Sequence, residues 1–215
     1  MNTARLRNSL GTLSACVLSL GQAYASGFVD DSHADLVMRN YYFDRNYVNA
    51  TPQAAAREWA QGFILNVRSG FTEGPVGFGL DAQGLLGVRL DSSRARTGTG
   101  LLPYSATTRE PADEYSELGL TAKVRASKSE LQLGTISTFL PIAFASPTRL
   151  LPQTFRGAYL KSQEIDKLTL HVGWLDRINL RDSTDYQKMS VASPNGRFKG
   201  AAQSERFTFL GGDYD

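Results

Sequence analysis

Basic side chains recur at the polar positions of several runs in which apolar and polar residues alternate. They are Arg39, Arg68, Arg89, Lys123, Arg125 and Arg156. An arginine fork binds a carboxylate through two hydrogen bonds and keeps its charge at any physiological pH. A row of such groups along one wall would let an anion pass from one group to the next without being trapped. The alternative is that each base is paired with a nearby acid, such as Asp81 or Glu117, and only stabilises the fold.

Residues suited to enzymatic chemistry are scarce. The chain has two histidines, His33 and His171, and no Gly-x-Ser-x-Gly or His-x-x-x-His pattern. The glycine-rich residues 97–100 lack the lysine of a phosphate-binding loop. Cys16 is the only cysteine, so the chain beyond it has no thiolate for catalysis or metal binding. We therefore expect no enzyme, no cofactor and no metal site, with an exported hydrolase that uses His171 as the enzymatic alternative.

The N-terminus has the features of an export signal. Arg5 and Arg7 precede an apolar stretch at residues 10–20, and Ala23-Tyr24-Ala25 offers a small-x-small cleavage site. We expect a signal peptide at residues 1–25 and a mature chain at residues 26–215. One alternative is a membrane anchor, although the apolar stretch is short for crossing ~30 Å of hydrocarbon as a helix. Lipoprotein processing at Cys16 is the second alternative.

The mature chain is electrically balanced. Removal of Arg5 and Arg7 lowers Lys+Arg from 23 to 21, against 21 Asp+Glu. A nucleic-acid binder needs a basic excess, so we expect no nucleic-acid partner.

Alternation with a period of two predicts β-strands over most of the mature chain. The clearest example is residues 76–91, where Val76, Phe78 and Leu80 alternate with Gly77 and Gly79. Similar runs occupy residues 33–44, 58–73, 117–126, 131–134, 155–159 and 168–174, and another begins at residue 207. The orientation of residues 33–44 stays open because three aromatic residues follow one another at positions 41–43. In residues 155–159 the apolar phase holds Phe155 and Tyr159, and the polar phase holds Arg156 and Ala158.

Short turns alternate with long loops along these runs, and the polar phases mix glycine with isolated charges. A soluble barrel fills its interior with apolar side chains, whereas a wide, wet channel tolerates glycine and charge on its inner wall. The pattern predicts an all-β fold, a transmembrane antiparallel up-and-down β-barrel with outer-membrane lipid around it. The alternative is an exported soluble β-sandwich or lipocalin-like binding protein.

Several short motifs resemble the N-terminal half of the OprD family of outer-membrane porins. They include Trp59-Ala60-Gln61-Gly62-Phe63, Ser69-Gly70-Phe71-Thr72-Glu73-Gly74, Thr97-Gly98-Thr99-Gly100 and Arg149-Leu150-Leu151-Pro152-Gln153-Thr154. The resemblance implies a barrel of about 18 strands, of which this chain would supply about eight as a fragment. It also implies passive, selective uptake of small carboxylates across the outer membrane, with a homotrimer as the candidate assembly.

The same resemblance assigns roles to basic residues. Arg39, Arg89, Lys123 and Arg125 stand at positions that match a basic ladder on one wall of the family's lumen. Residues 139–153 form an unusually apolar loop, and the matching family loop folds into the barrel. Its apolar residues would then pack on the inner wall and leave Arg149 at the constriction. The alternative for this loop is an extension of the neighbouring β-strand.

Overall fold

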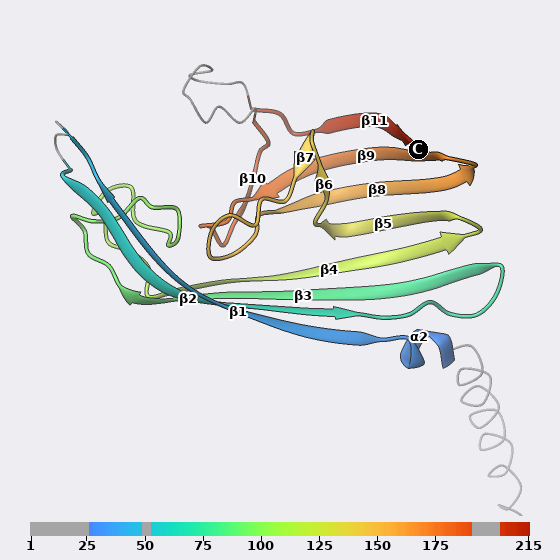
Figure 1. Cartoon of the computed structure of the whole chain (residues 1–215), viewed down its shortest axis with the longest axis horizontal. Helices are drawn as coiled ribbons and strands as arrows, with labels where there is room; N and C mark the ends of the chain where they lie inside the picture. Colours follow the sequence, from blue (N-terminus) through green and yellow to red (C-terminus); the bar gives the residue numbers. More distant parts are fainter. Residues whose placement is uncertain (1–25, 49–52, 191–202) are drawn as a thin grey trace, which may run out of the picture.

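The computed structural model describes residues 26–48, 53–190 and 203–215, and the expected signal peptide at residues 1–25 lies outside them. One short helix, α2 (Ser26–Asp30), precedes a chain built almost wholly of strands (Figure 1). The long strands are β1 (His33–Asn46), β2 (Ala55–Arg68), β3 (Val76–Asp91), β4 (Glu114–Ala126), β5 (Ser129–Ile136), β8 (Thr154–Ile165), β9 (Leu168–Asn179) and β11 (Phe207–Tyr214). The two-residue strands are β6 (Phe139–Leu140), β7 (Ala143–Phe144) and β10 (Tyr186–Gln187).

The long strands form one antiparallel sheet in the order β1-β2-β3-β4-β5-β8-β9, and both β10 and β11 pair with β9. Each long strand therefore lies beside the long strands that precede and follow it in the chain. The all-β, antiparallel, up-and-down prediction is confirmed, and so is the estimate of about eight long strands. No helix of the described residues is long and apolar enough to cross a membrane.

Alternation gives the sheet two chemically different faces. In β3, Val76, Phe78 and Leu80 are exposed on the outer face, although they are large and apolar. Gly77 and Gly79 lie on the inner face and are buried, because other segments pack over them. A tilted strand needs about 9 to 11 residues to cross a bilayer, so the 16 residues of β3 suffice to cross and extend beyond it.

The orientation of β1 follows from its pairing with β2. Leu36, Met38 and Tyr42 are exposed on the outer face. Tyr41 and Phe43 are partly buried and pack against the apolar cluster on the inner face. Three consecutive aromatic residues concealed this phase in the sequence, and the contacts across the sheet define it.

The expected phase of β8 is wrong for Tyr159. Tyr159 pairs with Gly173 and its hydroxyl meets His171, so it lies on the inner face, whereas Ala158 pairs with the exposed Trp174. Phe155, the other apolar residue of this run, is buried in the same cluster as Tyr159, and a register shift between Arg156 and Gly157 lies between the two residues. A pattern with strict period two cannot locate such a shift.

The turns and the loops lie at opposite ends of the sheet (Figure 1). Residues 69–75, 127–128 and 166–167 are the short turns, and α2 lies at the same end, where Gly70 N donates to Phe28 O at 3.0 Å. Phe71, expected in the strand of residues 58–73, lies in the first of these turns because β2 ends at Arg68. Residues 92–113 and 137–153, with the described residues 180–190 and 203–206, belong to the long connections at the other end. This asymmetry leaves the inner face free to receive the long loops.

Candidate functional site

The connection between β5 and β8, residues 137–153, crosses the inner face to reach the opposite side of the sheet. β5 and β8 are neighbours, yet Leu150 and Leu151 are buried against Ala60, Ile64 and Leu85 of β2 and β3. A Cβ at Gly62 would lie 3.0 Å from Leu150 Cγ, so the glycine makes room for the loop. Apolar burial therefore holds this loop on the inner wall.

The earlier part of this loop differs from the expectation. Ala143 and Ala145 are buried in a second cluster with Ile136 and Phe155, but Ile142 and Phe144 remain exposed. β6 and β7 form a small separate hairpin, so a strand extension is limited to two residues in each arm. The residues that anchor the loop to the wall of β2 and β3 are Leu150 and Leu151.

Arg39 fastens the loop to β1. Its Nη1 donates to the carbonyl oxygen of Pro147 at 3.0 Å and to that of Arg149 at 3.1 Å. Both acceptors are neutral, so these contacts hold the loop without cancelling the charge of the guanidinium. Arg39 is thus a loop anchor as well as a basic group on the inner face.

Arg149 lies where three segments meet. Its Nε donates to Thr99 O at 3.1 Å, and its Nη1 donates to Thr148 O at 2.9 Å. Its guanidinium carbon lies 5.0 Å from the ring centroid of Phe43. Carbonyls and an aromatic face orient this guanidinium while its positive charge persists.

A second arginine, Arg181, stands beside it and was missed by the sequence reasoning. Its Nη1 donates to Thr148 Oγ1 at 3.2 Å. A Cβ at Gly100 would lie 3.7 Å from the Nε atoms of both Arg149 and Arg181. Burial raises the pKa of the neighbouring Asp182 carboxyl above its ordinary value, and the two arginines oppose this shift. Arg181 lies beyond the alternating run of β9, and therefore no strand pattern marks it.

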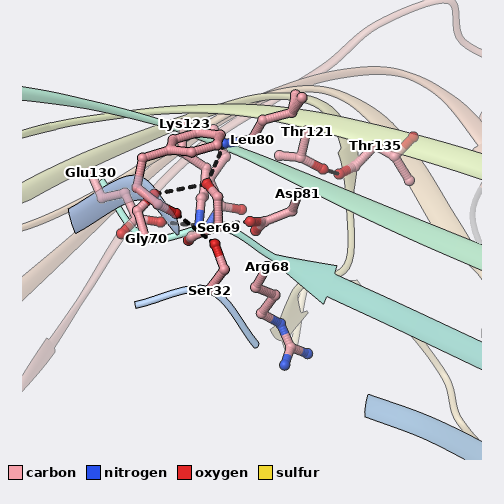
Figure 2. A network of polar contacts seen from close by, with 12 residues as sticks. Ser32, Arg68, Ser69, Gly70, Leu80, Asp81, Thr121, Lys123, Glu130 and Thr135 are labelled. Atoms are coloured by element: carbon pink, nitrogen blue, oxygen red, sulfur yellow. Dashed lines mark hydrogen bonds and ion pairs between the residues drawn. The ribbon is translucent and has the colours of Figure 1, made fainter. Parts of the chain in front are cut away.

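Lys123 is buried at the turn end of the inner face (Figure 2). Its Nζ lies 2.7 Å from Asp81 Oδ1 and donates to Ser69 O at 3.0 Å. Ser69 Oγ in turn accepts from Leu80 N at 2.7 Å. Phe71 lies under both bases, with its ring centroid 4.8 Å from Lys123 Nζ and 4.0 Å from the guanidinium carbon of Arg125. Hydrogen bonds and an ion pair therefore connect the side chains at this end of the inner face.

The other basic residues predicted to line the channel, Arg68, Arg89 and Arg156, form ion pairs with acids. Arg68 meets Asp35 at 3.1 Å, and Arg89 meets Asp113. Arg156 binds both carboxylate oxygens of Asp176, at 3.0 and 2.5 Å. Acid pairing, the alternative for single rungs, therefore describes the geometry of Arg68, Arg89, Lys123 and Arg156.

Two inner-face acids and His171 are engaged in other ways. Glu117 accepts hydrogen bonds from Thr154, Asn179 and Tyr186, not from a predicted rung. His171 lies between Tyr159 and Asp213, with Nδ1 2.6 Å from the hydroxyl and Nε2 2.9 Å from the carboxylate. Both ring nitrogens are therefore occupied. The described part of the chain holds no cluster of three or more His, Cys, Asp or Glu side chains arranged to bind a metal ion.

Comparison with known proteins places this sheet in a family. The family model for "outer membrane porin, OprD family" matches residues 26–215. The porin-like protein GalP of Pseudomonas putida is 42% identical over 193 residues, which cover 90% of this chain and 46% of GalP. Porin D of Pseudomonas aeruginosa is 44% identical over 152 residues, which cover 71% of this chain and 34% of Porin D.

Solved structures agree. Acinetobacter baumannii OccAB3 superposes with a TM-score of 0.82 at 42% identity, covering 87% of this chain and 47% of that one. Pseudomonas aeruginosa OpdK, solved with vanillate, gives a TM-score of 0.76 at 41% identity and covers 87% of this chain and 46% of that one. The chain spans about half the length of these relatives. Porins are channels rather than enzymes, so neither the hydrolase nor the soluble binding protein is favoured. The chain belongs to the OprD family of outer membrane porins.

Proposed function

We propose that this chain supplies the first strands of an outer-membrane channel through which small carboxylates diffuse, with Arg149 and Arg181 attracting the anion at the constriction. The observation that carries the proposal is that two guanidiniums flank Gly100: Arg149 comes from the loop held against the inner wall, and Arg181 comes from the connection after β9. A related solved structure, OpdK, contains vanillate, which is a small aromatic carboxylate. This supports carboxylates as the class of solute.

The hydrogen-bonding partners of Arg149 suit attraction without trapping. Carbonyl oxygens use some of its donors and fix its plane without neutralising its charge, which the neighbouring Asp182 carboxyl opposes in part. A carboxylate about 4 Å away gains ~1 kcal/mol in a water-like medium and more where water is partly excluded. Attraction of this size favours entry and still permits rapid exit.

We assign the other basic side chains of the predicted ladder different strengths of attraction for an anion. An acid partner cancels most of the field of Arg68, Arg89, Lys123 or Arg156 at a distance, so we assign these four bases a weak attraction. Arg125 lies over Phe71, whose ring leaves the charge in place. We assign Arg125 the role of a second attractive position, nearer the turn end.

The test uses a hybrid pore, defined as residues 26–215 of this chain followed by the part of GalP beyond its matched segment. Benzoate currents and reversal potentials are recorded in planar bilayers. Arg149→Gln and Arg181→Gln should each raise the half-saturating benzoate concentration about fivefold, since each removes ~1 kcal/mol of attraction. Arg94→Gln is the matched control, because Arg94 is exposed and paired with Glu110 in the long loop. Equal effects of all three variants would refute the constriction.

Assembly into a homotrimer stays a prediction of the family resemblance. Chemical cross-linking of the hybrid pore in detergent should give a ladder that ends at three copies. A ladder that ends at one copy, with the cross-linker active on a known trimer, would contradict it.

A further inference from the structure

Glu58 is a carboxylate buried completely within the wall. It lies on β2, pairs with Phe43 of β1, and is 0% exposed. A charged group without access to water is costly unless other groups compensate it. Within residues 26–48, 53–190 and 203–215, no Lys, Arg or His side chain forms an ion pair with it. Its compensation must come from neutral donors.

Those donors all come from the loop of residues 92–113. Ser92 Oγ donates to Glu58 Oε1 at 3.1 Å, and Thr99 N donates to Glu58 Oε2 at 3.0 Å. The hydroxyl of Thr99 also donates to Oε2. Two of the three hydrogen bonds therefore hold a single residue, Thr99, which is itself buried.

The backbone around Thr99 is shaped for this contact. Gly98 and Gly100 have φ values of +99° and +77°, a region that favours glycine. Thr99 Oγ1 also accepts from Leu101 N at 3.1 Å, which closes the turn. The turn directs the Thr99 N–H toward Glu58 and leaves the Thr99 carbonyl to accept from Arg149 Nε at 3.1 Å. A continuous chain of contacts thus joins the wall carboxylate to the constriction guanidinium.

We propose that Glu58 is a positioning residue for the carboxylate pathway: it fixes Thr99, and Thr99 fixes Arg149. The inference rests on the proposed function and adds a residue that touches no solute. It predicts that the charge of Glu58 and its hydrogen bonds have opposite effects on anion binding. The negative charge of Glu58 opposes an anion, whereas its acceptor atoms place the arginine that attracts the anion.

Two substitutions at position 58 separate charge from position. Glu58→Gln keeps one oxygen for Thr99 and an amide that can donate to Ser92 Oγ, while the negative charge is lost. In the hybrid pore, its half-saturating benzoate concentration should stay unchanged or fall. Glu58→Met removes the acceptors and should raise that concentration about fivefold, because Arg149 loses its support. If charge alone mattered, both variants would lower it equally.

Thr99 gives a second, independent pair should Glu58→Met fail to fold. Thr99→Ser retains the hydroxyl and should match the unmodified pore, whereas Thr99→Val should raise the half-saturating concentration. Conductance in KCl serves as the readout of general pore integrity. In an Arg149→Gln background, Glu58→Met and Thr99→Val should cause no further change, because the residue they position is gone.

The outcomes separate the two claims. If the unmodified hybrid pore shows no preference for benzoate anions over cations, the proposed function itself fails. If that preference is present but Glu58→Met and Thr99→Val leave it intact, only the positioning role is overturned. The positioning role is also overturned if Glu58→Met and Thr99→Val raise the half-saturating benzoate concentration by the same factor with Arg149 present and with Arg149→Gln.

Discussion

Truncation of one buried leucine should release the loop of residues 137–153, which we propose narrows the channel. Leu150 is 0% exposed and lies in a cluster with Ile64, Leu85 and Leu101. Leu→Ala changes in well-packed cores cost about 2 to 5 kcal/mol, and the cost is largest where neighbours cannot fill the cavity. The wall opposite Leu150 is Gly62, which has no side chain to move inward. We therefore expect Leu150→Ala to cost about 3 to 5 kcal/mol.

This cost falls on the docking of residues 137–153 rather than on the sheet, because the strand ladders do not involve Leu150. A loss of ~3 kcal/mol shifts the docking equilibrium about 100-fold toward the released loop. The hybrid pore with Leu150→Ala should conduct more KCl and flicker between two levels. Trypsin should also cleave after Arg149, because that bond becomes accessible.

The matched control is Leu118→Ala, the same chemical change at a residue that is 73% exposed on the outer face of β4. It should leave conductance and trypsin resistance unchanged. Equal conductance and the same cleavage pattern for Leu150→Ala and Leu118→Ala would contradict the prediction. In that case the loop would be held by its polar contacts alone.

Three further changes test other contacts of the site. Gly62→Val, a change on β2 itself, introduces a Cβ 3.0 Å from Leu150 Cγ. It should displace the same loop and raise the KCl conductance. Because burial raises the pKa of Asp182, this carboxyl should gain its proton at a higher pH than an exposed carboxyl and stop opposing anions. Acidification should therefore increase chloride selectivity before exposed carboxyls become protonated, and Asp182→Asn should abolish that change. Lys123→Met leaves Asp81 without its partner and should destabilise the folded pore by about 3 kcal/mol, measured as a lower temperature for loss of the folded band in gels; adding Asp81→Asn should restore part of the loss, and no recovery would contradict the pairing.

Strand prediction succeeded where alternation was uninterrupted. The predicted run at residues 76–91 coincides with β3, because large apolar residues and glycines alternate there and a Gly-Pro pair closes the preceding turn. It failed in two kinds of place. Adjacent aromatic residues left the phase of β1 open, and Tyr159 of β8, expected on the outer face, is buried in a cluster with Phe155 and Leu175. Both depend on what lies across the sheet, which a local pattern does not contain.

The site was less accessible to sequence reasoning than the fold. Arg149 was found because a family motif surrounds it, but Arg181 lies in a connection with no periodicity. Its proximity to Gly100 joins residues about eighty positions apart, a contact created only when both loops turn inward. Nor does alternation distinguish a base that meets an acid from a base that meets carbonyl oxygens. Arg89 and Arg39 both occupy polar positions, yet Arg89 meets Asp113 and Arg39 meets Pro147 O.

That distinction changes how a basic wall should be understood. If every lumen base were equally available, selectivity would be spread along the strands, and any single substitution would have a small effect. In this sheet, acids partner four of the predicted rungs, and Arg39 holds the loop through carbonyls. Carbonyl oxygens also orient Arg149, which lies in the loop between β5 and β8. Under the proposed function, the strongest attraction for anions lies at Arg149 and Arg181. We therefore expect the buried contacts that hold the loop of residues 137–153, Leu150 and the Glu58–Thr99 link among them, to affect anion binding as the charges themselves do.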